Sequence, residues 1–186
     1  MSAPIQPGSH KFGPDSATLL VTTSRKGAAS RAGHDLVIEV TAWSATLEVG
    51  EDSAPTTLEL DADAGSLRVR EGTGGVQKLG DDDKADIQKT IDEEVLLREP
   101  IRFRSTAIDA GDDGRVIVTG DLTLVGRTKP IEFGLRVDPE GGIAGTAVVK
   151  QSDWGIKPYS ALFGALKVKD EVVVSIEGRL PEPQGA

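Results

Sequence analysis

The adjacent pair His34-Asp35 is the first combination of side chains in this chain that could do acid–base or metal chemistry. Such a pair ligates metal in phosphohydrolases, but only with further histidine and aspartate ligands from neighbouring helices. The chain has only two histidines, and the other, His10, lies in an N-terminal segment that we expect to be frayed. We therefore interpret His34-Asp35 as a hydrogen-bonded turn at the start of a strand, and we predict no catalytic residue and no metal site.

The other candidate motifs for chemistry are incomplete. The segment DADAG, which starts at Asp61, begins like a calcium loop but has Gly65 at the fifth position, where an acidic or amide ligand is needed. Ser152 and Ser160 lack the strand–turn–helix context of a serine nucleophile. The chain contains no cysteine, which excludes disulfides and thiolate ligands. We predict no cofactor and no enzymatic activity.

Charge and the N-terminal sequence restrict the partners and the location. The chain holds 21 Lys and Arg against 30 Asp and Glu, a formal net charge of −9. An acidic surface repels phosphate backbones, so we expect no nucleic-acid partner. Residues 1–16 contain no apolar run, so we expect neither a signal peptide nor a transmembrane segment. The expected location is the cytoplasm.

Alternation of apolar and polar residues dominates the chain and predicts antiparallel strands with one wet face. The clearest examples are Arg115–Leu124 and residues 168–180; in the latter, Val174 and Ile176 should face inward and Glu177 outward. Shorter examples occur at residues 18–24, 36–42, 58–62, 101–107, 131–137 and 143–149. Turn-forming Gly, Asp and Pro separate them, which predicts an up-and-down antiparallel barrel of roughly eight strands.

One segment has the spacing of a helix instead. Residues 80–100 read GDDDKADIQKTIDEEVLLREP, with Ile87, Ile91 and Val95 four apart and acidic residues clustered at the start. We predict one amphipathic helix over 83–97, capped by Asp83, and a short second helix before His34. The expected organisation is a flexible segment over 1–15, a single barrel domain over 16–181 and a flexible tail over 182–186.

The predicted interior contains several small residues. Ala42, Ala62, Gly120, Gly145 and Ala147 stand at positions that alternation turns inward, and the chain has only seven aromatic residues. A barrel of this kind has room for one elongated apolar ligand, or larger neighbours fill the space. Composition leaves both alternatives open. Trp43 shares the strand face of Val37 and Glu39, which we predict to point outward.

Several motifs, in order, resemble the YceI-like family of lipid- or polyisoprenoid-binding proteins. Residues 151–180, QSDWGIKPYSALFGALKVKDEVVVSIEGRL, are similar to the closing segment of that family. GHDL at 33–36, EPIRFRST at 99–106 and VTGDLTLVGRTKPIEF at 118–133 are similar to three further family segments. The resemblance covers most of 18–180. It implies an eight-stranded, lipocalin-like antiparallel barrel that encloses a long isoprenoid or related amphiphile, and the N-terminus is similar to that of the shorter, cytoplasmic members.

The segment that starts at Gln151 then has a physical interpretation as the mouth of the barrel. Gly155, Pro158 and Gly164 turn the chain, while large side chains between them line the opening. Trp154 and Tyr159 have polar edges that suit a ligand with a wet head and a buried tail. The alternative is a structural plug that closes the barrel end. The residues expected to contact the ligand are His34, Phe103, Val118, Leu122, Trp154, Ile156, Tyr159, Phe163, Leu166 and Val174.

The resulting hypothesis is non-covalent binding of a long apolar or polyisoprenoid-like lipid for carriage, storage or sequestration. The expected partner is a long-chain isoprenoid or another amphiphilic lipid, and a homodimer is left open. Two rivals remain. One is an isomerase or hydrolase of apolar substrates that uses His34 and Asp35. The other is a stress-related interaction module with a packed barrel.

Overall fold

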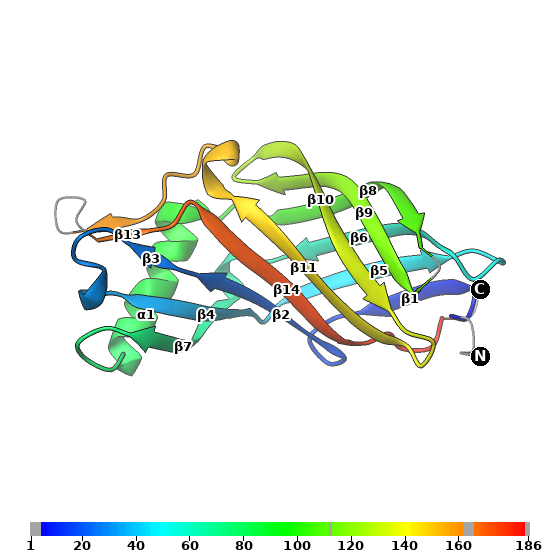
Figure 1. Cartoon of the computed structure of the whole chain (residues 1–186), viewed down its shortest axis with the longest axis horizontal. Coiled ribbons are helices and arrows are strands. Elements are labelled where there is room, and N and C mark those ends of the chain that lie inside the picture. Colours follow the sequence, from blue (N-terminus) through cyan, green and yellow to red (C-terminus); the bar gives the residue numbers. More distant parts are fainter. Residues whose placement is uncertain (1–4, 112, 162–165, 185–186) are drawn as a thin grey trace.

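The computed structural model describes residues 5–111, 113–161 and 166–184, which form mostly antiparallel strands (Figure 1). One longer helix is present, α1 (Asp81–Thr90), which continues through the widened turn η3 (Ile91–Val95). The short 3₁₀ turns are η1 (Ser30–Ala32), η2 (Ala64–Ser66) and η4 (Gln151–Trp154). The strands are β1 (Gly8–Phe12), β2 (Ala17–Thr23), β3 (Arg25–Lys26), β4 (His34–Val40), β5 (Trp43–Val49), β6 (Pro55–Ala62), β7 (Leu67–Gly74), β8 (Ile101–Ala110), β9 (Arg115–Leu124), β10 (Arg127–Val137), β11 (Gly142–Lys150), β12 (Ser160–Ala161), β13 (Leu166–Val168) and β14 (Glu171–Arg179).

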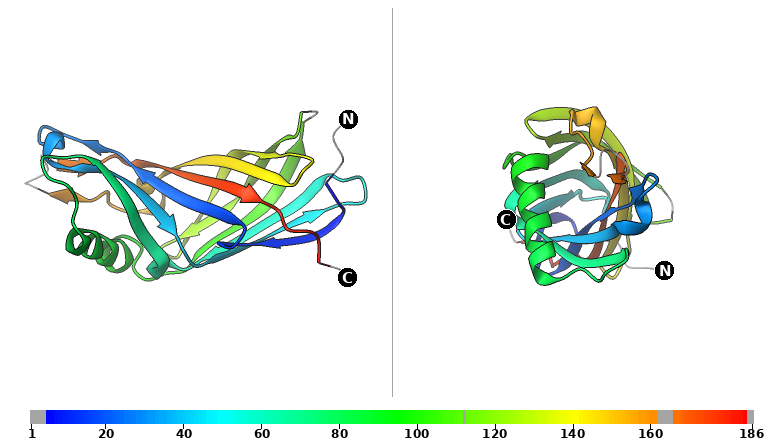
Figure 2. Two further views of the ribbon diagram at one scale, coloured as in Figure 1. Left: turned by 90° about the horizontal axis from the view of Figure 1, so that it is seen from below. Right: turned by 90° about the vertical axis from the view of Figure 1, so that its left-hand side faces the viewer.

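Eleven strands form one antiparallel sheet in the order β1-β5-β6-β8-β9-β10-β11-β14-β2-β4-β7, and β12, β13 and β3 form a small second sheet. The large sheet curls strongly into a half-barrel, with α1 beside its open side (Figure 2). The predicted all-β class with one helix is therefore confirmed. The predicted closed barrel of about eight strands is not confirmed, because the described residues of the edge strands β1 and β7 do not pair with each other.

A shared corner explains why the sheet has more strands than alternation predicted. The segments 34–49 and 55–74 each bend once, which divides them into β4 and β5 and into β6 and β7. At the bend, the N–H of Thr41 donates to the Ser66 carbonyl and the N–H of Asp63 donates to the Ala42 carbonyl, both at 3.0 Å. The predicted strands over 36–42 and 58–62 match β4 and β6, and the pairing continues past the corner into β5 and β7, which were not predicted.

The same corner makes the predicted orientation of Trp43 wrong. Along β4, Ile38 and Val40 are buried, whereas along β5 the buried positions are Trp43, Ala45 and Leu47. The two residues of the bend shift the alternation by one position, which exchanges the inner and outer faces. The indole of Trp43 therefore lies inside, with its ring edge-on to Phe12 at a centroid distance of 5.9 Å.

The N-terminal segment is more ordered than we predicted. Gly8–Phe12 form β1, which pairs with β5 along its whole length. His10, expected in a frayed segment, is 3% exposed. Its Nδ1 lies 2.8 Å from the Pro181 carbonyl oxygen, and its Nε2 lies 2.8 Å from that of Gln6. The His10 ring thus connects the two ends of the chain. A second connection is the N–H of Gln184, in the predicted tail, which donates to the Ser9 carbonyl.

The predicted helix is present and covers the edge of the sheet. Its N-cap is Gly80 rather than Asp83; the Asp83 carboxylate accepts the Gly80 N–H at 2.9 Å from the third helical position. Acidic residues in the first turn suit the positive end of the helix dipole. The Gln88 side-chain oxygen accepts the N–H of Val69 in β7 at 2.9 Å. The helix thus satisfies part of an edge that β7 would otherwise expose.

The long strand that we predicted over 168–180 is divided by a bend into β13 and β14. Within β14, Val174 and Ile176 face inward but are only half-buried, and Glu177 is exposed, as its alternation predicts. Incomplete burial of inward-facing residues indicates that the inside of the half-barrel is not filled.

Candidate functional site

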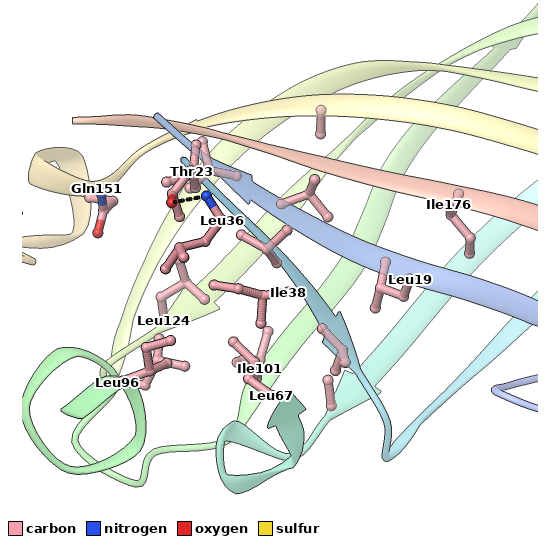
Figure 3. Close-up of a pocket in the computed structure, with 18 of the residues that line it drawn as sticks. Leu19, Thr23, Leu36, Ile38, Leu67, Leu96, Ile101, Leu124, Gln151 and Ile176 are labelled. Carbon is pink, nitrogen blue, oxygen red and sulfur yellow. Dashed lines mark hydrogen bonds between the residues drawn. The ribbon is translucent and has the colours of Figure 1, made fainter. Parts of the chain in front are cut away.

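The half-barrel encloses an apolar cavity of about 560 Å³ between the inner face of the sheet and α1 (Figure 3). This volume lies within the range of roughly 300–1,000 Å³ that is usual for small-molecule sites. The cavity is lined mainly by leucine, isoleucine and valine from both halves of the sheet, including Leu19, Ile38, Leu67 and Leu124. An interior of this kind can bind an apolar molecule through burial, without chemistry.

Helix α1 completes one side of the cavity. Ile87, Ile91 and Val95 line it and are half-buried, so the apolar stripe of the helix faces the cavity rather than a packed sheet. Phe103 of β8 and Phe133 of β10 also line the cavity, and their rings pack at a centroid distance of 5.3 Å. The apolar stripe of the helix is therefore part of the site. The spacing of four residues predicted that this face is apolar, but not that it borders a cavity.

The small inward-facing residues contribute unequally to the space. Ala62, Gly145 and Ala147 line the cavity. Gly120 instead makes room for packing, because a Cβ there would lie 2.5 Å from the ring of Phe103. Ala42 stands on the corner and is exposed. In the β11–β14 register, Ala147 is opposite Val174 and Gly145 is opposite Ile176. The small side chains on β11 therefore leave space on the cavity side of this strand pair.

Polar side chains concentrate at the end of the cavity where η4, β3 and β13 meet. The polar or charged lining residues from this end are Thr23, Arg25, His34, Gln151, Tyr159 and Lys167. Figure 3 shows Gln151, Thr23 and Leu36 toward one end of the lining side chains. The far end, toward Phe12, Ala45 and Leu47, is apolar. The cavity thus has the polarity of an amphiphile site, with one wetter end and one dry end.

His34 and Asp35 do not form the hydrogen-bonded pair that we predicted. They are consecutive strand residues, so their side chains leave opposite faces of β4. The ring of His34 lines the cavity, and its Nε2 lies 2.7 Å from the Gln77 carbonyl oxygen. The Asp35 carboxylate accepts the N–H of Arg25 at 2.7 Å and lies 3.9 Å from the Arg25 guanidinium. His34 thus contacts the loop after β7, and Asp35 contacts strand β3.

The turn η4 closes the polar end, and Trp154 is its buried anchor. Trp154 is 2% exposed, and its indole N–H donates to the Leu122 carbonyl at 2.8 Å. Gly155 ends the turn at a φ of 73°, in the left-handed region that glycine adopts without strain. The aromatic ring therefore packs behind the cavity wall and is not among the lining residues.

Asp170 ties η4 to the start of β14. The Ser152 hydroxyl donates to one carboxylate oxygen, and the Ser152 N–H donates to the other at 2.8 Å. The hydroxyl bond is the main cause that holds the pKa of Asp170 below its ordinary value; partial desolvation opposes it, and the backbone bond, Lys150 and Lys26 add to it. The ionised carboxylate is thus the form that fixes the turn.

The structure places the residues expected to contact a ligand in three groups. Those that line the cavity are His34, Phe103, Leu122, Ile156, Tyr159 and Val174. Val118 and Trp154 are buried but do not line it. Phe163 and the side chain of Leu166 lie outside the described residues.

Other lining residues were not singled out from the sequence, although their signal was present. Leu36 and Ile38 share one face of a predicted strand, and Ile131 and Phe133 share one face of another. Alternation placed these residues inside, but it does not separate a side chain that packs on another from one that borders a cavity.

Within residues 5–111, 113–161 and 166–184, no three His, Asp or Glu side chains gather in a group that could hold a metal ion. In the same residues, no helix has the length and apolar character needed to cross a bilayer.

Curated relatives match only part of the chain. A UPF0312 protein of Ectopseudomonas mendocina is 33% identical over 85 residues, which are 41% of this chain and 43% of that protein. A UPF0312 protein of Vibrio cholerae is 43% identical over 68 residues, which are 32% of this chain and 36% of that protein. The matched segments thus span less than half the length of either relative.

Solved structures match over most of the chain. Burkholderia cenocepacia BcnA superposes with a TM-score of 0.64 at 15% identity, over 87% of this chain and 94% of BcnA. A Campylobacter jejuni YceI protein superposes with a TM-score of 0.60 at 13% identity, over 80% of this chain and 85% of that chain. These likenesses show a shared fold. In sequence, the YceI-like domain matches residues 18–180, and the chain therefore belongs to the YceI-like domain family.

Proposed function

We propose that this protein binds one long apolar lipid, of polyisoprenoid-like character, non-covalently inside the half-barrel, for carriage, storage or sequestration. The observation that carries the proposal is the apolar cavity of about 560 Å³ with polar residues gathered at one end. A chain that enters it leaves water along its whole length, at a gain of roughly 25 cal/mol per Å² of apolar surface buried.

The two rival functions have less support. A packed interaction module would fill the half-barrel, whereas Val174 and Ile176 remain half-buried against the cavity. An enzyme that uses His34 with Asp35 would need the two side chains together, whereas Asp35 binds Arg25 on the other face of β4. The cytoplasmic location and the homodimer stay predictions from the sequence.

The test is a calorimetric titration of delipidated protein with geranylgeraniol in detergent below its micellar concentration. We expect one molecule per chain with a negative heat-capacity change, the signature of apolar burial. Ala147→Phe places a ring in the cavity, opposite Val174, and should weaken binding by roughly tenfold or more, about 1.4 kcal/mol per factor of ten.

The matched control is Ala144→Phe. Ala144 lies three residues earlier on β11, opposite Glu177, and is exposed on the outer face. This variant adds the same ring without entering the cavity, so binding should match the wild type. Equal weakening by both variants, or absence of binding to the wild type, would overturn the proposal.

A further inference from the structure

Gln151 is a buried polar side chain at the wetter end of the cavity. It is 8% exposed and lines the cavity from the first position of η4 (Figure 3). Its backbone N–H donates to the Asp170 carbonyl at 2.9 Å, and its side-chain Nε2 donates to the Lys169 carbonyl at 3.2 Å. Because a carbonyl can only accept, this second bond fixes which end of the amide is nitrogen.

The other end of that amide is an acceptor without a protein donor. Among the residues that the structure describes, none donates a hydrogen bond to Gln151 Oε1. Thr23 also lines the cavity, and its side-chain oxygen accepts the Leu36 N–H at 3.3 Å. Among the described residues, Trp43 Nε1 is the only fully enclosed side-chain nitrogen or oxygen without a partner, so Gln151 Oε1 remains accessible and a ligand donor can reach it.

We infer that Gln151 Oε1 recognises the head group of the bound lipid and selects amphiphiles whose head is a hydrogen-bond donor, such as a prenyl alcohol or another hydroxyl-bearing lipid. This inference rests on the proposed function. The two bonds that Nε2 and the backbone make hold the acceptor in place before the ligand arrives, so little rotamer entropy is lost on binding. Lipids that present only acceptors, such as ethers, gain no such bond.

The cationic residues at this end fit a negatively charged head less well. Arg25 donates to the carbonyls of Gly33 and Thr73 and lies 3.9 Å from the Asp35 carboxylate, so its charge is already compensated. Lys167 is exposed to solvent, which screens it. Neither group is both anchored and free to bond a neutral donor, whereas Gln151 Oε1 belongs to an amide held by Lys169 and has no protein donor among the described residues.

The test compares two probes, of which the second lacks the hydroxyl donor and carries one methyl group in its place. Wild-type protein is titrated with geranylgeraniol and with its methyl ether, in the same detergent. We expect the alcohol to bind roughly two- to tenfold more tightly, the net effect of one hydrogen bond. In Gln151→Met, which keeps the length of the side chain and removes the acceptor, the two probes should bind equally.

The wild-type comparison needs no variant and decides the inference even if Gln151→Met fails to fold. Tight binding of both probes with equal affinity would overturn the role of Gln151 and leave the proposed function standing. A preference for the alcohol that persists in folded Gln151→Met would place the recognising group elsewhere. Failure of both probes to bind would overturn the proposed function and this inference with it.

Discussion

Two aromatic residues of the segment 151–161 have different surroundings. Trp154 is buried behind the wall, with its N–H bonded to the Leu122 carbonyl, whereas Tyr159 lines the cavity and is 50% exposed. A buried ring contributes mainly to stability, and a ring on the cavity rim contributes mainly to binding.

We therefore predict opposite phenotypes for their truncation. Trp154→Ala should lower the free energy of unfolding by about 3–5 kcal/mol. Tyr159→Ala should change it by no more than about 0.5 kcal/mol and should weaken geranylgeraniol binding by about 1 kcal/mol. Urea denaturation and calorimetric titration measure the two effects. A Trp154→Ala variant of unchanged stability would contradict the assignment of this ring as an anchor.

At the scale of elements, η4 is held to β14 through the ionised carboxylate of Asp170. Its pKa is below the ordinary value in the folded state, chiefly because of the Ser152 hydroxyl. A depressed carboxyl pKa adds stability that is fully present above the unfolded pKa and is lost as pH falls through the folded pKa. The relevant range lies below roughly pH 4, the ordinary aspartate value.

The prediction compares wild type with Asp170→Asn by urea denaturation between pH 7 and pH 2.5. The variant should be less stable at pH 7, and the difference should shrink below roughly pH 4 as the wild-type carboxylate becomes protonated. Asp153→Asn, which removes an exposed carboxylate from the same turn, is the charge-matched control. A difference between wild type and Asp170→Asn that stays constant with pH would show that ionisation of Asp170 does not fix the turn.

The elements differ in how well the sequence predicted them. Arg115–Leu124 matches β9 because its alternation is uninterrupted and turn residues stand at both ends. The helix was found because Ile87, Ile91 and Val95 keep one spacing. The corner at residues 41–42 was missed because each strand beside it alternates normally, and only the tertiary pairing of the Thr41 N–H with the Ser66 carbonyl reveals the bend. The first strand, β1, was not predicted because it forms through pairing with β5, and this tertiary contact is not visible in the local sequence.

At the scale of the whole molecule, a single curved sheet surrounds a cavity. The presence of this cavity was the hardest feature to predict from the sequence. Alternation says that Val174 faces inward, but not that Ala147 opposite it leaves space beyond. The role of Gln151 was also missed, because a glutamine beside a strand end is usually exposed and its burial depends on Lys169 and Asp170. The lipid ligand was predicted from the family resemblance alone, and the cavity that would hold it forms because the sheet is strongly curved.

The central claim, that the apolar chain lies inside the half-barrel, is tested most directly by photo-crosslinking. A geranylgeraniol analogue with a diazirine in its tail is bound, irradiated and mapped to single residues by mass spectrometry. Strand β14 separates the two outcomes, since Val172, Val174 and Ile176 line the cavity and Val173 between them is exposed outside. We predict labels on Val172, Val174 or Ile176 and on Ile87 of α1 and Ile91 of η3, with competition by unlabelled geranylgeraniol. Competed labels confined to Val173 and its outer-face neighbour Val148 would contradict the account.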